Sequence, residues 1–227
     1  MRKILFVLSI FIVCFLFHTD ISAQIHSRFE AEFSIKEKDI NGNKLLTVGK
    51  VYYDKTIQKI VFDISFPQKQ VLIFQDSLVY QIDADTLTKV SPSGIPPTFT
   101  VYHLALNGNL EYFGLKESHY ILSEVEEEDS LIISSWFIPD SNFGKIMLSQ
   151  NSKKLTGLIS FDKEENILSK QFFEDYISIS GFEFPSRIIQ YLFVLDKKTI
   201  KVTTYRKVLV NEMENDHMYD YPIPGFM

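Results

Sequence analysis

The sequence predicts a mainly β fold, built as one antiparallel sheet in chain order with a short helical insertion. Nearly all of the chain after Gln24 consists of short runs of β-branched and aromatic residues. The segments between these runs are short and rich in Asn, Asp, Gly and Pro, as hairpin turns are. Because such turns join consecutive strands, we expect a continuous meander and not two domains.

The strand-like runs are expected at 27–37, 45–53, 57–66, 69–75, 77–83, 119–125, 130–138, 145–151, 155–161, 165–177, 186–195 and 199–210. Alternation is clearest at 60–66, where the even positions are all large and apolar: Ile60, Phe62, Ile64 and Phe66. Because successive side chains point to opposite faces of a strand, this run should present one apolar face.

Other runs are apolar on both faces, notably 71–74 and 188–195. Strands of this kind are typical of sheets covered on both sides. A short helical insertion cannot cover both sides of a sheet of about eleven strands. The sheet should therefore curl on itself, pack against a partner or hold something apolar. Leu72 and Phe74, assigned to the face opposite Phe62, require a covering of their own.

The helical insertion is predicted at about 96–117. Val101, Leu104 and Ala105 recur at helical spacing, and Asn107-Gly108-Asn109 then supplies a stop and a new cap before Leu110. We expect two short helices here, lying across one face or the mouth of the sheet.

The N-terminus has the order of a secretory signal peptide. Arg2 and Lys3 precede an apolar run of about fourteen residues, shorter than the roughly 20 that span a bilayer, and Ala23 provides a small-residue cleavage site. Cys14 lies inside this run and is interpreted as a small hydrophobe in a discarded segment. Residues 1–23 are therefore expected to be removed, which places the protein in the periplasm.

The remaining chain carries 21 basic and 28 acidic residues and no cysteine. Its net charge of −7 argues against a nucleic-acid partner, because phosphate binding needs clustered basic residues. Without disulfides, an exported protein must be stabilised by its core, and the 204 residues from Gln24 suffice for one.

The sequence contains no Gly-x-Ser-x-Gly elbow, no phosphate-cradling glycine loop and no histidine pair at metal-ligand spacing. Residues 83–85 begin like a calcium loop but lack its later glycine and glutamate, so we interpret them as a turn. The acidic run 124–129 is interpreted as a solvated hairpin end. We expect a binding protein without enzymatic activity, cofactor or metal.

Residues 49–83 show a specific order. A strand opened by Gly49 ends at Lys55, and an apolar strand, Pro67, a strand ending at Phe74 and the run 78–83 follow. The C-terminal stretch adds Val208-Leu209-Val210-Asn211 and, after a loop, Tyr219 to Pro224. In these features the chain resembles the LolA-like family, the periplasmic carriers of outer-membrane lipoproteins. It departs from the family in reaching its first strand without a preceding helix.

The resemblance implies an unclosed antiparallel β-barrel of about eleven strands with a helical lid at 96–117. It implies a monomer that shelters acyl chains between an inner-membrane transporter and an outer-membrane acceptor. Lys55 stands where the family often has an arginine tying the sheet to the lid. The lid residues proposed to meet the cargo are Leu104, Leu106 and Phe113, and those of the cavity wall are Phe62, Ile64, Phe66, Ile73, Phe137, Phe161 and Phe173.

An alternative of another class remains open. The protein could be a structural or interaction protein of the envelope whose apolar sheet face packs on a protein partner. A cavity that an apolar probe enters distinguishes the carrier from this alternative.

Overall fold

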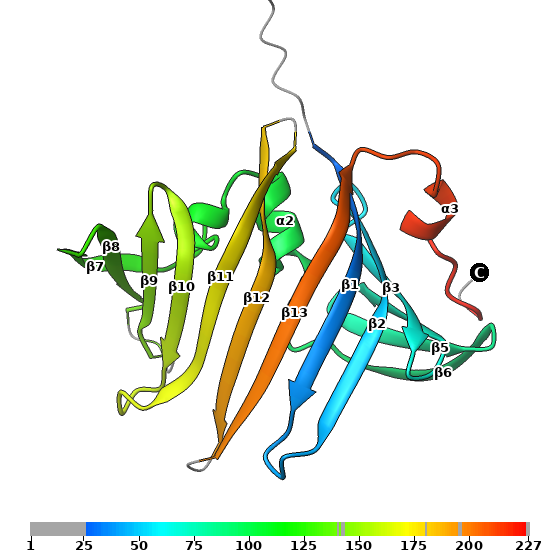
Figure 1. Ribbon diagram of the computed structural model, residues 1–227, viewed down its shortest axis with the longest axis horizontal. Coiled ribbons are helices and arrows are strands. Elements are labelled where there is room, and N and C mark those ends of the chain that lie inside the picture. Colours follow the sequence, from blue (N-terminus) through cyan, green and yellow to red (C-terminus); the bar gives the residue numbers. More distant parts are fainter. Residues whose placement is uncertain (1–25, 140, 142–143, 180, 195–196, 226–227) are drawn as a thin grey trace, which may run out of the picture.

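The computed structural model describes residues 26–225 except 140, 142–143, 180 and 195–196. The predicted signal peptide lies outside the described residues. The chain forms one curved antiparallel sheet of thirteen strands, shown in Figure 1. The strands are β1 (Arg28–Lys38), β2 (Lys44–Asp54), β3 (Lys59–Phe66), β4 (Gln70–Gln75), β5 (Leu78–Asp83), β6 (Thr86–Pro92), β7 (Ile121–Glu128), β8 (Leu131–Phe137), β9 (Ile146–Asn151), β10 (Lys154–Phe161), β11 (Ile167–Ile179), β12 (Phe182–Val194) and β13 (Lys197–Val210).

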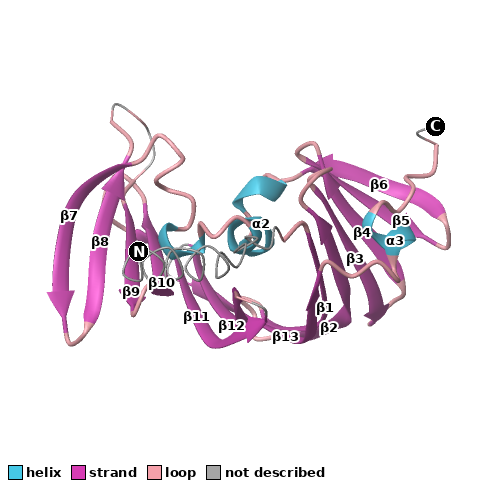
Figure 2. Ribbon diagram, turned by 90° about the horizontal axis from the view of Figure 1, so that it is seen from above, coloured by secondary structure: helices cyan, strands magenta, loops and turns pink. Residues whose placement is uncertain are grey.

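The expected meander is confirmed, with one long-range pairing that joins its two halves. Every strand pairs with its sequence neighbour except β6 and β7, and β1 pairs with β13. The sheet order therefore runs from β6 through β1 and β13 to β7, and these two consecutive strands form its opposite edges. Seen from above, the sheet is a trough whose edges do not meet (Figure 2). The barrel is therefore unclosed.

Two strands depart from the sequence prediction. β6 was not expected, because its residues are mostly polar and exposed. An edge strand with little burial needs no apolar alternation, so the sequence carries no period-two signal there. β12 begins at Phe182 and not at 186, and Pro185 lies inside it. Pro185 pairs with Tyr176 beside Asp175, which has a left-handed φ of 53°, and such irregular positions are where sheets accept proline.

The acidic run also lies differently from the prediction. Glu124 to Glu128 belong to β7, whose residues are all exposed, and only Asp129 and Ser130 form the turn to β8. Charged side chains along an edge strand discourage pairing with another chain.

The helical insertion is confirmed between β6 and β7. It consists of the 3₁₀ turn η1 (Pro97–Phe99), the helix α2 (Val101–Leu106) and the 3₁₀ turn η2 (Leu110–Tyr112). Because the insertion connects the two edges of the sheet, it crosses the hollow of the trough, where α2 lies in Figure 2. The sheet wraps around this segment.

The two faces of the sheet have separate apolar clusters. The larger lies on the concave face and joins α2 and η2 to strands of both halves, including Phe29, Val51, Leu148 and Phe184. The smaller lies on the convex face of β2 to β5 and includes Tyr52, Val61, Ile73 and Tyr80. A strand that is apolar on both faces can therefore contribute side chains to the concave cluster on one face and to the convex cluster on the other.

A C-terminal segment covers the convex cluster. After β13, the chain forms the short helix α3 (Asp216–Tyr219) and continues to Gly225. Tyr219 is fully buried against Tyr52, with the ring centroids 5.6 Å apart. Lys59 Nζ donates to Asp220 at 2.5 Å and to the Tyr221 carbonyl at 3.1 Å, and Arg28 pairs with Asp216 at 2.6 Å. The covering that the sequence required behind this part of the sheet comes from the chain's own end.

Candidate functional site

The principal apolar pocket lies on the concave face, between α2 and the sheet. Its volume is about 670 Å³, within the range of small-ligand sites. The wall comes from both halves of the trough: Ile60, Phe62 and Phe74 on β3 and β4, and Phe173 and Ile188 on β11 and β12. The loop before η1, the helix α2 and Phe113 cover it, and Gln171 and Gln190 are polar groups in its lining. We call this cavity the concave pocket.

Three polar contacts tie α2 to the sheet beside the concave pocket. The Tyr53 hydroxyl lies 2.5 Å from His103 Nδ1, and the buried Tyr102 hydroxyl lies 2.8 Å from that of Tyr205. Lys55 Nζ donates to the Leu106 carbonyl at 3.5 Å. The lysine thus contacts the last residue of α2, and its coupling role stays a prediction. These contacts join the helix to side chains of β2 and β13 and to Lys55, which directly follows β2.

Burial shifts the ionisation of these groups. Desolvation, with the nearby charge of Lys55, lowers the pKa of His103, so its ring is neutral near pH 7. Desolvation also raises the pKa of Tyr53 and of Tyr102, and it raises that of Tyr205 to about 12. The Tyr53–His103 and Tyr102–Tyr205 contacts are therefore made between neutral groups, beside the charged Lys55.

His103 should make stability depend on pH below neutrality. Because its pKa is lower in the folded than in the unfolded chain, the unfolded chain binds more protons between the two values. Stability is then fully present above the unfolded pKa of about 6.5 and falls as the pH drops below it. Urea midpoints at pH 7.5 and pH 5 should differ more for the wild type than for His103→Gln, which cannot titrate. An equal fall in both proteins would contradict this assignment.

The structure brings part of the predicted site together. Phe62, Phe113 and Phe173 line the concave pocket, and the rings of Phe113 and Phe173 lie 5.9 Å apart. Ile64, Leu104 and Leu106 belong to the concave cluster but are at most 6% exposed. Ile64 lies on β3, and Leu104 and Leu106 are buried residues of α2, of which Leu106 lines a second pocket described below.

The assignment of Ile73 to the cavity wall is wrong. Ile73 pairs with Val61, not with Phe62, so it points to the convex face and is fully buried there. Leu72 and Phe74 were assigned to the opposite face and instead lie on the concave side, where Leu72 pairs with Phe62. The apolar run 71–74 has no alternation, so the sequence did not fix its register against β3.

Three further aromatic residues lie outside the pocket. Phe66, at the end of β3, is 50% exposed and belongs to neither cluster. Phe137 follows the concave-face Trp136 along β8, so it points to the convex side. Phe161 ends β10 at a register irregularity, with Lys145 Nζ 5.2 Å from its ring centre.

Sequence reasoning missed the mouth of the concave pocket. Ile95 and Phe99 contribute to its lining and are 58% and 37% exposed. They stand in the turn-rich segment before α2, whose prolines and glycine mark only a loop. The sequence did contain a signal for this mouth, because two large apolar residues in an exposed loop often mark a binding surface.

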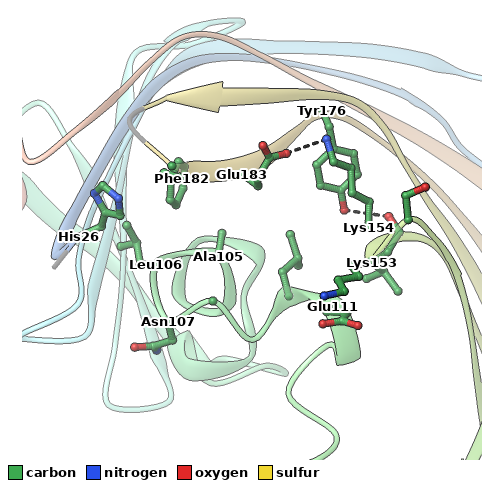
Figure 3. Close-up of a pocket in the computed structure, with 15 residues that line it drawn as sticks. His26, Ala105, Leu106, Asn107, Glu111, Lys153, Lys154, Tyr176, Phe182 and Glu183 are labelled. Carbon is green, nitrogen blue, oxygen red and sulfur yellow. Dashed lines mark hydrogen bonds and ion pairs between the residues drawn. The ribbon is translucent and has the colours of Figure 1, made fainter. Parts of the chain in front are cut away.

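A second pocket of about 610 Å³ lies on the other side of α2, toward β10 to β12 (Figure 3). Its lining is mixed. Lys154 pairs with Glu183 at 2.8 Å, and the Tyr176 hydroxyl donates to the Leu155 carbonyl at 2.8 Å. Because these polar groups would have to be desolvated by an apolar ligand, this pocket suits an acyl chain less well than the concave pocket.

Comparison with known proteins gives likeness in structure alone. No family model matches the sequence, and no curated protein matches it. A LolA superfamily protein from Nitrosomonas europaea superposes with a TM-score of 0.57 at 12% identity, over 85% of this chain and 90% of that one. A putative outer membrane lipoprotein-sorting protein domain from Vibrio parahaemolyticus gives 0.60 at 8% identity, over 86% and 90%. The chain shares the fold of these two proteins.

A further solved structure matches this LolA-like fold. A DUF1329 family protein from Desulfovibrio piger superposes with a TM-score of 0.59 at 14% identity, over 87% of this chain and 91% of that one. At these identities the likeness establishes the architecture, namely the open sheet around a helical segment. It leaves the ligand to be argued from the residues of the pocket.

The described residues contain neither a metal-binding cluster nor a membrane-spanning helix. In that part of the chain, no group of three or more His, Cys, Asp or Glu side chains is arranged to hold a metal ion. No helix among the same residues has the length and apolar character needed to cross a membrane.

Proposed function

We propose that this protein is a periplasmic carrier that shelters the acyl chains of lipoproteins, or of another lipid, in its concave pocket. The main support for this proposal is the pocket itself, which is an apolar cavity lined by both halves of an open sheet and covered by a helical segment. The likeness of its fold to an outer membrane lipoprotein-sorting domain supports this class of cargo.

The pocket has the physical properties that such cargo requires. Each methylene removed from water contributes roughly 0.8 kcal/mol, so a wall of phenylalanine and isoleucine side chains retains an acyl chain without covalent chemistry. Ile95 and Phe99 offer an exposed apolar entry. We propose that α2 with its flanking turns is the lid, and that the wall residues are Phe62 and Phe173 with Phe74 and Ile188 in place of Ile73.

Transfer follows from reversible binding. As a carrier of the LolA-like kind, the protein would receive its cargo from an inner-membrane lipoprotein-releasing transporter and deliver it to an outer-membrane acceptor, as a monomer. Breaking the contacts of α2 with Tyr53, Lys55 and Tyr205 would widen the pocket for loading.

Two measurements test the proposal. Delipidated protein should bind a fluorescent fatty acid saturably, and an acylated lipoprotein peptide should displace the probe. Added to spheroplasts, the protein should release a lipidated lipoprotein but not its unlipidated form. Absence of any probe binding would reject the carrier and favour an envelope protein whose apolar surface packs on a protein partner.

A further inference from the structure

The convex face carries a second surface, far from the concave pocket, formed by two cross-strand rows. In the first row, Leu46, Lys36, Val202, Ile189 and Phe172 are successive partners across β2, β1, β13, β12 and β11. In the second row, the partners on the same strands are Lys44, Lys38, Ile200, Tyr191 and Lys170. We call these ten residues the basic apolar face.

Alternation places both rows on the outside of the trough. Gln171 and Gln190 lie between the two rows in sequence and line the concave pocket. Their neighbours along each strand must therefore point the other way. The C-terminal segment covers a different part of the convex side, over β2 to β5, where Tyr219 is buried. The basic apolar face lies toward the opposite ends of the strands.

The apolar members form a continuous and partly exposed surface. Leu46 and Phe172 are each 38% exposed, and the Phe172 and Tyr191 rings meet edge to face with centroids 6.1 Å apart. Lys198 Nζ lies 5.8 Å from the centre of the Tyr191 ring. Aliphatic, aromatic and lysine side chains in this mixture are typical of protein surfaces at the boundary between water and lipid.

The charge of the face is opposite to that of the chain. Its two rows hold four lysines and no acidic residue, whereas the chain from Gln24 has a net charge of −7. The ion pairs nearby use other groups: Lys201 pairs with Glu37 on the concave side, and Glu174 pairs with Arg187. Asp39, in the adjacent turn, accepts hydrogen bonds from the backbone of Asn41 and Asn43. Within the described part of the chain, the four lysines have no carboxylate partner, so they are available to an anionic surface.

We infer that the basic apolar face docks the protein on an anionic lipid bilayer. The lysines would attract the phosphate-bearing surface from solution, and Leu46, Phe172 and Tyr191 would enter the headgroup boundary. Because the concave pocket lies on the other side of the sheet, docking and cargo binding use different residues. The inference does not rest on the proposed carrier function.

Vesicle binding tests the inference. The chain from Gln24 should partition onto vesicles of phosphatidylcholine with phosphatidylglycerol, much less onto phosphatidylcholine alone, and should dissociate as salt is added. Lys36→Glu with Lys38→Glu should weaken partitioning at least about tenfold, since each lysine is attracted to such a surface and each glutamate is repelled by it. Lys89→Glu with Lys153→Glu is the control, because it makes the same charge change at exposed positions elsewhere.

A site-specific readout completes the test. Cys14 is the sole cysteine of the sequence and lies in the predicted signal peptide, so the chain from Gln24 accepts a single label. A polarity-sensitive dye on Leu46→Cys should shift to the blue with anionic vesicles, and the same dye on Val125→Cys of β7 should not. Three results would each overturn the inference. The protein could fail to bind anionic vesicles, or the two double variants could lose vesicle binding equally. The dye on Leu46→Cys could also shift with lipid-free envelope proteins and not with vesicles. Phe62→Glu should bind vesicles normally, which separates this result from failure of the carrier proposal.

Discussion

Phe62→Glu is expected to lower the affinity for a fatty-acid probe at least about 100-fold, equivalent to roughly 2.7 kcal/mol. Phe62 lines the concave pocket, and its ring lies 5.4 Å from Phe33, 5.5 Å from Phe74 and 6.3 Å from Tyr102. A carboxylate at this position must either stay charged among aromatic rings or draw water into the pocket, and both remove the apolar environment that an acyl chain needs.

The matched control is Phe137→Glu. It makes the same chemical change at a position of similar sequence character that lies outside the pocket and is 39% exposed. This variant should bind the probe as the wild type does. Phe62→Leu, which keeps the site apolar, should lose no more than a few-fold in affinity, and circular dichroism should show native strand content for all three variants. Unchanged probe binding by folded Phe62→Glu would show that the concave pocket is not the binding site.

Tyr219→Ala should lower the free energy of unfolding by about 3–5 kcal/mol, the usual cost of deleting a large buried aromatic side chain. Tyr219 is fully buried, contacts Tyr52 and carries the Arg28 guanidinium 4.8 Å from its ring centre. Its loss would open a cavity over Val61, Ile73 and Tyr80 on the convex face. Urea denaturation followed by circular dichroism measures the change.

Tyr219→Phe distinguishes packing from hydrogen bonding. The Tyr219 hydroxyl is buried and has no hydrogen-bond partner among the described residues. Removing a buried, unpaired polar group while keeping the ring should leave stability unchanged or raise it. A loss as large as that of Tyr219→Ala would mean that the hydroxyl, and not the ring, stabilises the C-terminal segment.

Much of the fold followed from local patterns. The alternation at 60–66 correctly placed Ile60, Phe62 and Ile64 on one face, because the period of two survives wherever one face is wetter than the other. The helical segment was also predictable. Asn107-Gly108-Asn109 separates α2 from η2, and residues of this kind mark the end of one helical element and the start of another. The short hairpin turns predicted the order of pairing within each half of the sheet.

The site was harder to predict, for a specific reason. Phe62, Phe113 and Phe173 are far apart in sequence and meet because the β1–β13 pair joins two separate meanders into one trough. Phe137 and Phe161 belong to similar apolar runs, but Phe137 follows the concave-face Trp136 and Phe161 ends β10 at a register irregularity, and neither lines the pocket. Aromatic content alone could not separate lining residues from the others.

The sequence by itself determined the class of the fold, the helical insertion and the apolar character of the protein. Only the tertiary structure decided which face each residue of 71–74 occupies. An unbroken apolar run fits the sheet in either of two registers that differ by one residue, and the pairing with β3 selects one of them. The second apolar face was predicted to need a helix or a partner, and it is covered by Tyr219 from the end of the chain. That contact joins residues more than a hundred positions apart, and no local pattern in a sequence encodes it.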